Sequence, residues 1–190
     1  MGWRSGRTRE SDKKEKNYDL YQAMSSLAIR KFPDQILKQP AKTIDRVDDE
    51  LRQFITALTA TMYAYPHCVG LAAPQVGQAL RIAVMDISVH PKGQGSHGKI
   101  VLINPHVDHF EKLTIQREGC LSVPDFTANV RRAQKIRVRA LDENGQSRIW
   151  RLEGFEAIVA QHEIDHLDGK LFLDRVANLT TDVFRRKTYL

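Results

Sequence analysis

The chain of 190 residues is poor in cysteine, has no long apolar run and has no repeated segment. Its two cysteines, Cys68 and Cys120, are too few and too far apart for a disulfide framework, which favours a reducing compartment. No apolar run approaches the roughly 20 residues that cross a bilayer, so we expect no membrane partner. These absences exclude a disulfide-stapled secreted scaffold and a helical membrane protein.

The composition is that of one globular domain. A hydrophobic content of 42% in 190 residues suits a single core. The 29 Lys and Arg against 23 Asp and Glu give a net charge of +6, which favours acidic surroundings without indicating specific DNA binding. Residues 1–23 are dense in charge and lack an apolar segment, so we expect a disordered extension before a single metallohydrolase domain at 24–190. The extension is either a real tail or an artefact upstream of a start at Met24.

Local patterns predict an α+β fold. Apolar spacing predicts helices over 48–65 and 155–167, the first capped by Asp48 and the second ended by Gly169. Strands are predicted at 80–87 and 100–104, with a surface loop at 90–99 and a hairpin that joins 135–142 to 146–154. We expect antiparallel or mixed sheets packed around the second helix.

The second helix carries the segment QHEIDH. His162 and His166 continue its apolar stripe toward the core, and their i, i+4 spacing lets both imidazoles bind one metal ion. Glu163 lies about 100° around the helix from His162, within reach of a water at such an ion, which is the geometry of a general acid/base. The alternative is one satisfied core histidine, one exposed histidine and a solvated glutamate.

Two histidines do not complete a catalytic metal site, which normally has three protein ligands. The extended endopeptidase motif would place its third histidine at Phe172, and neither Glu nor His follows His166. The third ligand should therefore come from upstream. The candidates are Cys68, Cys120, His67, His90, His97, His106 and His109.

These candidates differ in context. His90 and His97 flank the glycine-rich loop and are expected to be exposed, while His106 and His109 are either turn residues or a weak surface metal pair. Cys120 lies in EGCLSVP, a stretch between Gly and Pro that can approach a site, and a thiolate is a strong ligand for a soft or borderline ion. Inert packing is the ordinary role of a lone buried cysteine.

Three stretches together, GLAAPQ at 70–75, EGCLS at 118–122 and QHEIDH at 161–166, resemble the peptide deformylase family. The resemblance runs from Met24 to Asp174. It implies an enzyme that hydrolyses the N-formyl group from the formylmethionine of new polypeptides and releases formate. It also implies a bacterial-type cytoplasmic protein, with an organelle as the alternative, that acts on N-formylmethionyl nascent peptides.

The resemblance also implies roles for particular residues. Fe(II) is the expected ion, with Zn, Ni or Co as alternatives. The implied metal ligands are Cys120, His162 and His166, with Glu163 as the general acid/base and Gln75 and the Leu121 backbone N–H as oxyanion donors. The implied substrate-binding residues are Val69, Gly70, Glu118, Gly119, Ile158 and Val159; the first two would pair with an extended peptide, and the last two would wall a methionine pocket.

Two features depart from the family pattern. Cys68 stands where the family has the first glycine of G-x-G-L-A-A, which raises the question of whether the backbone there needs φ > 0. The long C-terminal helix of some members is absent or very short, so we expect at most a weak, charge-driven ribosome association. Two other functions stay open: another metal hydrolase, such as an endopeptidase, and a module that binds formylated peptides without turnover.

Overall fold

The computed structural model describes residues 27–186. The predicted disordered extension at 1–23 lies outside the described residues. The elements follow one another as η1 (Gln35–Lys38), α2 (Asp49–Ala64), β1 (Gly70–Ala72), η2 (Ala73–Val76), β2 (Ile82–Met85), β3 (Ile100–Cys120), β4 (Val123–Leu141), β5 (Ser147–Glu153), α3 (Gly154–Leu167), η3 (Phe172–Arg175), α4 (Leu179–Asp182) and β6 (Val183–Arg185).

The first predicted helix is confirmed as α2. The Asp48 carboxylate accepts from the Leu51 backbone N–H at 3.0 Å, which caps the helix at its start. The buried stripe of α2 packs against β1 and β2 through Ile55, Leu58 and Met62. The helix therefore covers one end of the sheet.

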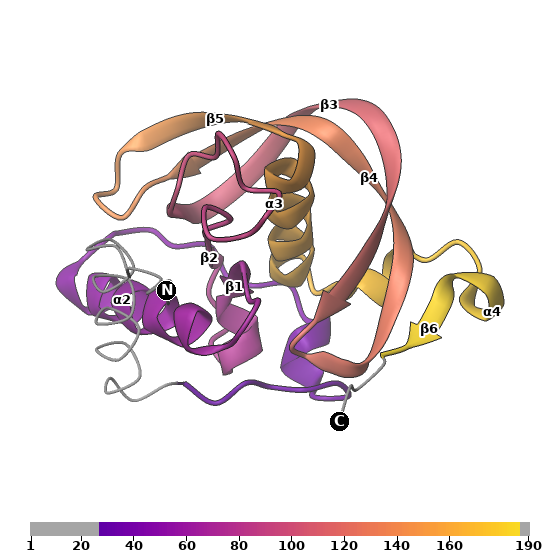
Figure 1. The fold of residues 1–190 in the computed structure, drawn as a ribbon. Helices are drawn as coiled ribbons and strands as arrows, with labels where there is room; N and C mark the ends of the chain where they lie inside the picture. The colour runs from indigo at the N-terminus through magenta and orange to yellow at the C-terminus, as the bar shows by residue number, and fades with distance from the viewer. Residues whose placement is uncertain (1–26, 187–190) are drawn as a thin grey trace, which may run out of the picture.

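The strands form one antiparallel sheet in the order β1-β2-β3-β4-β5, with β6 paired to β4. The predicted hairpin is confirmed, since β4 and β5 pair up to Leu141 and Ser147 beside their turn. The strand predicted at 80–87 is shorter in the structure, and the one predicted at 100–104 continues through to Cys120 as β3. In Figure 1 the β3–β4 pair forms a long curved ribbon that arches over α3.

Helix α3 lies inside the curve of the sheet, and this arrangement confirms the α+β class. Its residues Ala157, Val159, Ala160 and Ile164 join a core with apolar side chains from β2, β3, β4 and β5. Gly169, with φ of 70°, follows its end, as the sequence predicts. A helix buried on nearly every side can present polar side chains only to other protein groups or to a ligand.

The chain after α3 is short and contains no long helix as far as residue 186. The helix α4 has four residues, and β6 then returns to pair with Phe126–Ala128 of β4. No helix among the described residues is long and apolar enough to cross a membrane.

Candidate active site

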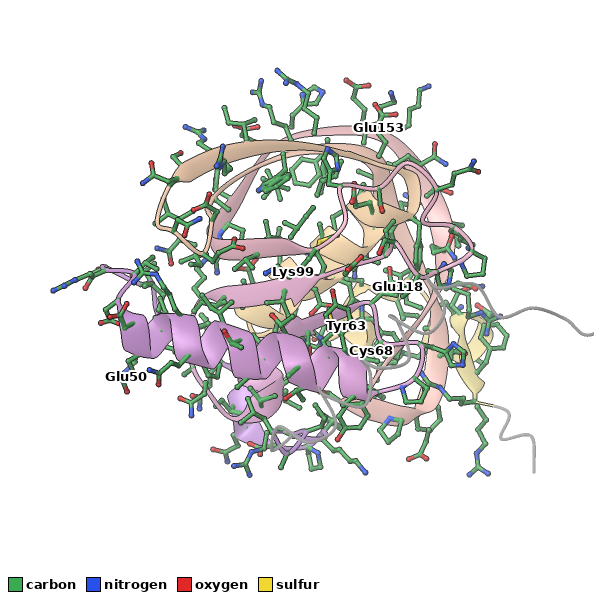
Figure 2. The ribbon with its side chains drawn as sticks, turned by 60° about the vertical axis from the view of Figure 1, so that its left-hand side comes forward. Glu50, Tyr63, Cys68, Lys99, Glu118 and Glu153 are labelled. Carbon is green, nitrogen blue, oxygen red and sulfur yellow. The ribbon has the colours of Figure 1, made fainter. Side chains whose placement is uncertain are left out.

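A pocket of about 470 Å³ opens where α3 faces β1 and the end of β3. The pocket is lined by residues 66–70, Gln75, residues 116–121, Thr127, the α3 residues Phe155, Ile158, Val159, His162 and Glu163, and Arg186. Figure 2 shows two of them, Cys68 and Glu118, beyond the C-terminal end of α2 and far from Glu50 near its start.

Three potential metal ligands meet at the floor of this pocket. Ligand atoms of Cys120, His162 and His166 all lie within 4.8 Å of one another, and the Cys120 Sγ is 3.3 Å from the His166 Nε2. Helix α3 supplies both imidazoles from successive turns, and the last residue of β3 supplies the thiol. Burial opposes ionisation of Cys120, but His166 and His162 lower the pKa of its thiol well below the ordinary value. The sulfur therefore has the character of a thiolate ligand.

These donors fit a divalent ion. His162 donates from Nδ1 to the Glu118 Oε2 at 2.8 Å, which turns its Nε2 toward Cys120, the arrangement common for metal-bound histidines. One sulfur and two nitrogens suit a soft or borderline metal, with further positions left for water or substrate. Residues 27–186 contain no other group of three such ligands.

Glu163 lies beside the cluster without joining it. Its carboxylate occupies the space over Gly70 that a Cβ would need, so any larger residue at position 70 would displace it. Its Oε2 is buried and has no hydrogen-bond partner among the described residues. Burial raises the pKa of Glu163 to about 7, although His162 and His166 act to lower it. A carboxyl group with a pKa near neutrality can both accept and return a proton.

The predicted oxyanion donors lie next to the sulfur. The Gln75 Nε2 donates to the Cys120 Sγ at 3.3 Å and to the Ser122 Oγ at 3.2 Å, while its Oε1 accepts from the Ala72 N–H at 2.9 Å. Leu121 lines the pocket next to Cys120. Both amide hydrogens of Gln75 are thus engaged, and one must be released before the amide can donate to a substrate oxygen.

Glu118 has a role at this site that the sequence analysis missed. Its carboxylate accepts from Arg132 at 2.7 and 3.0 Å as well as from His162, and Arg132 also donates to Asp165. Burial opposes the charge, yet the bonds from His162 and Arg132 hold the pKa of Glu118 at about 2. The carboxylate is therefore committed to orienting His162, which leaves the backbone of this residue for any contact with a peptide.

Arg132 could not be predicted from composition, because Arg131 and Arg132 are adjacent in the sequence and composition does not indicate which of them faces the core. Strand alternation carries the signal: Ala128, Val130 and Arg132 lie on the buried face of β4, and Arg131 is exposed. A charge on an otherwise apolar strand face indicates a buried partner.

The other predicted substrate residues border the pocket. Ile158 and Val159 are each 6% exposed and form its apolar wall together with Phe155, which was not among the predicted site residues. Val69 and Gly70 lie on the opposite side, where β1 pairs with β2 along one edge only. The Gly119 backbone lies at the rim, next to Arg186.

The remaining histidines do not join the metal cluster. His106 and His109 lie in strand β3 rather than in a turn, and His109 pairs with Glu111 at 2.6 Å. His97 is exposed, as expected, although its ring bonds to the buried Glu156 at 2.7 Å, whereas His90 is half-buried and stacks on Phe155, against the expectation. The glycine-rich loop is thereby fastened to the start of α3.

Cys68 does not need the backbone freedom of glycine. Its φ is not positive; the positive φ of 64° belongs to His67. The Cys68 thiol donates to the Gly70 carbonyl at 3.1 Å, and burial, followed by the nearby Glu163, raises its pKa to about 12. The thiol therefore stays protonated and apart from the metal ligands.

The fold and this cluster define a class: an α+β protein in which one cysteine and two histidines are placed to hold a metal ion. Comparison with known proteins narrows the class. The sequence profile of the polypeptide deformylase family matches residues 26–182. Peptide deformylase of Thermodesulfovibrio yellowstonii is 41% identical over 164 residues, covering 86% of this chain and 97% of that protein.

Solved structures agree. Peptide deformylase from Synechococcus elongatus in complex with actinonin has a TM-score of 0.73 at 40% identity and covers 80% of this chain and 79% of its own. A class I type b peptide deformylase from Acinetobacter baumannii with Met-Ala-Ser bound has a TM-score of 0.75 at 33% identity and covers 80% and 99%. The chain belongs to the peptide deformylase family, and its reaction is the metal-dependent hydrolysis of the N-formyl group from the formylmethionine of new polypeptides, with release of formate.

Proposed function

We propose that Cys120, His162 and His166 bind the catalytic ion and that Fe(II) is that ion, with Zn, Ni and Co as substitutes. The observation that carries this proposal is the meeting of the three ligand atoms within 4.8 Å at the floor of the pocket. When bound, the ion would supply a Lewis acid and an activated water. Arg132, through Glu118, would keep the His162 ring in the orientation that binding requires.

Glu163 is the general acid/base in this proposal. Its carboxylate takes a proton from the attacking water and returns it to the amine of the leaving methionine. The Gly70 backbone allows this carboxylate its position, and the buried, unpartnered Oε2 is the atom that would hold the proton. Gln75 and the Leu121 N–H would stabilise the oxyanion once the Gln75 amide turns from Ser122.

The pocket beside the ligands would take the methionine side chain. Ile158, Val159 and Phe155 offer an apolar wall to the thioether, and the Val69–Gly70 edge of β1 and the backbone of Glu118 and Gly119 would flank the extended peptide. The similar Acinetobacter baumannii protein has been solved with Met-Ala-Ser bound, which supports a peptide of this kind as ligand.

The wider setting follows from the reaction. We propose that residues 24–190 act as one metallohydrolase domain in the cytoplasm, on N-formylmethionyl nascent chains, with an organelle as the alternative. The net charge of +6 supports a weak attraction to ribosomal RNA, and the four-residue α4 gives no long helix for docking within the described chain. Co-sedimentation with ribosomes should be detectable at low salt and absent at moderate salt.

The test is formate release from formyl-Met-Ala-Ser by protein purified anaerobically with Fe(II). Replacing Glu163 by Gln should lower kcat by about 10²- to 10⁴-fold and leave the metal content unchanged. The matched control is Glu153→Gln, an exposed carboxylate outside the pocket at the start of α3, which should leave kcat unchanged. Stoichiometric metal without formate release by the parent would instead support a binding module.

A further inference from the structure

Two arginines border the mouth of the pocket and take no part in the reaction described above. Arg117 lies near the end of β3, and Arg186 follows β6; both line the pocket. Unlike the buried Arg132, neither forms an ion pair with any carboxylate among the described residues. We call Arg117 and Arg186 the cationic rim.

The pairing of β6 with β4 determines the position of Arg186. Thr127 is the register partner of Phe184, and the Arg186 backbone N–H donates to the Asp125 carbonyl at 2.8 Å. The guanidinium of Arg186 then covers Gly119, where an added Cβ would collide with its Nη2. Gly119 immediately precedes the metal ligand Cys120, so this charge lies close to the reacting centre.

Arg117 is fixed by the same strand. Its guanidinium lies over the Phe184 ring, 3.4 Å from the centroid, and its Nη1 donates to the Thr127 Oγ1 at 3.3 Å. Stacking restrains the arginine plane and leaves other N–H groups available to a ligand. The rim therefore presents two positive charges in adjacent, restrained positions.

An extended peptide would bring particular residues to this rim. With the formyl group at the metal ligands, each following residue advances by about 3.3 Å. Arg117 lies three positions before Cys120 along β3, and Arg186 covers Gly119, the residue next to Cys120. With the methionine side chain against the apolar wall, the second and third residues of the nascent chain would thus lie beside the cationic rim.

We propose that Arg186 and Arg117 are specificity residues that favour formylated chains with an acidic side chain at position two or three. The inference rests on the proposed function, because it needs the peptide to lie with its formyl group at Cys120 and the histidines. A carboxylate can accept two hydrogen bonds from a guanidinium, which a glutamine of similar size cannot match.

The test compares charged and neutral peptides of the same length on the Fe(II) holoenzyme. The pairs are formyl-Met-Glu-Ser-amide with formyl-Met-Gln-Ser-amide, and formyl-Met-Ala-Glu-amide with formyl-Met-Ala-Gln-amide; the amides remove the terminal carboxylate. In at least one pair the parent should favour Glu over Gln by about 3- to 10-fold in kcat/KM at low salt, and less at high salt. Arg117→Gln combined with Arg186→Gln should bring the ratio to about 1.

The control is Arg185→Gln, which removes an exposed charge at the end of β6, outside the pocket, and should keep the parent ratio. Calorimetric binding of the deformylated products, Met-Glu-Ser-amide against Met-Gln-Ser-amide, gives the same ratio without turnover. A Glu-to-Gln ratio of kcat/KM near 1 in the parent for both pairs, or an unchanged ratio in the double variant, would contradict the proposed role of the rim. Absence of formate from all four peptides would overturn the proposed function. The ratio of the calorimetric affinities would still show whether the rim favours a carboxylate.

Discussion

The floor and the mouth of the pocket use charge in opposite ways. At the floor, the Glu118 carboxylate bonds to Arg132, which lies just behind it, is 3% exposed and also bonds to Asp165, so that every one of these charges is buried and paired. At the mouth, Arg117 and Arg186 are exposed and pair with no carboxylate in the described chain. Buried charges interact strongly but must be compensated, whereas exposed charges interact weakly and remain available. Floor residues should therefore control stability and metal binding, and mouth residues should control only selectivity.

The largest effect should come from Arg132→Met. The substitution leaves the carboxylates of Glu118 and Asp165 buried without this partner, which should lower the free energy of unfolding by about 3–5 kcal/mol. Urea unfolding of the metal-free protein measures the loss. Arg131→Met, at the exposed neighbour, should change stability by less than about 0.5 kcal/mol. Equal losses in the two variants would contradict the distinction between floor and surface.

A smaller effect is expected from Glu118→Gln. The amide still fills the site but no longer offers His162 a charged acceptor, so metal affinity should fall by about 10- to 100-fold. Competition with a chelator measures the affinity. The comparison variant is Glu111→Gln, an exposed carboxylate on the same strand, which should bind metal as the parent does. Unchanged affinity in Glu118→Gln would remove this residue from the support of His162.

The smallest effect should come from Cys68→Gly, which restores the family's usual glycine. Because the φ of Cys68 is already one that any residue adopts, and its thiol makes one weak bond to Gly70, kcat/KM should change by less than about 3-fold. Steady-state kinetics with formyl-Met-Ala-Ser measure the change. A gain of 100-fold would mean that the side chain at position 68 obstructs the peptide.

The sequence predicts the parts of the fold that depend on local patterns. Helix α2, the β4–β5 hairpin and α3 each have a cap, a turn or a periodic apolar face, and α3 also carries the QHEIDH motif. The full length of β3 could not be predicted, because between residues 106 and 117 it pairs with β4 alone, and most of its side chains are exposed. Such a strand has little of the alternating burial on which prediction depends.

The site follows the same division. The helical spacing of one short segment predicts His162, Glu163 and His166, and the resemblance to a family adds Cys120 and Gln75. In the rim, Arg186 is positioned by β6, a three-residue strand that pairs with residues far back in the chain, and nothing local in its sequence indicates that pairing. The contact of Arg186 with Gly119 is made only by the tertiary fold, so the local sequence carries no signal that predicts it.

The most direct test of the account is the absorption spectrum of the Co(II)-substituted protein and two serine variants. If Cys120 binds the ion with His162 and His166, the parent should show a thiolate-to-cobalt charge-transfer band in the near ultraviolet, which Cys120→Ser should lose and Cys68→Ser should keep. A band that persists in Cys120→Ser, or that disappears in Cys68→Ser, would contradict the assignment of the metal centre.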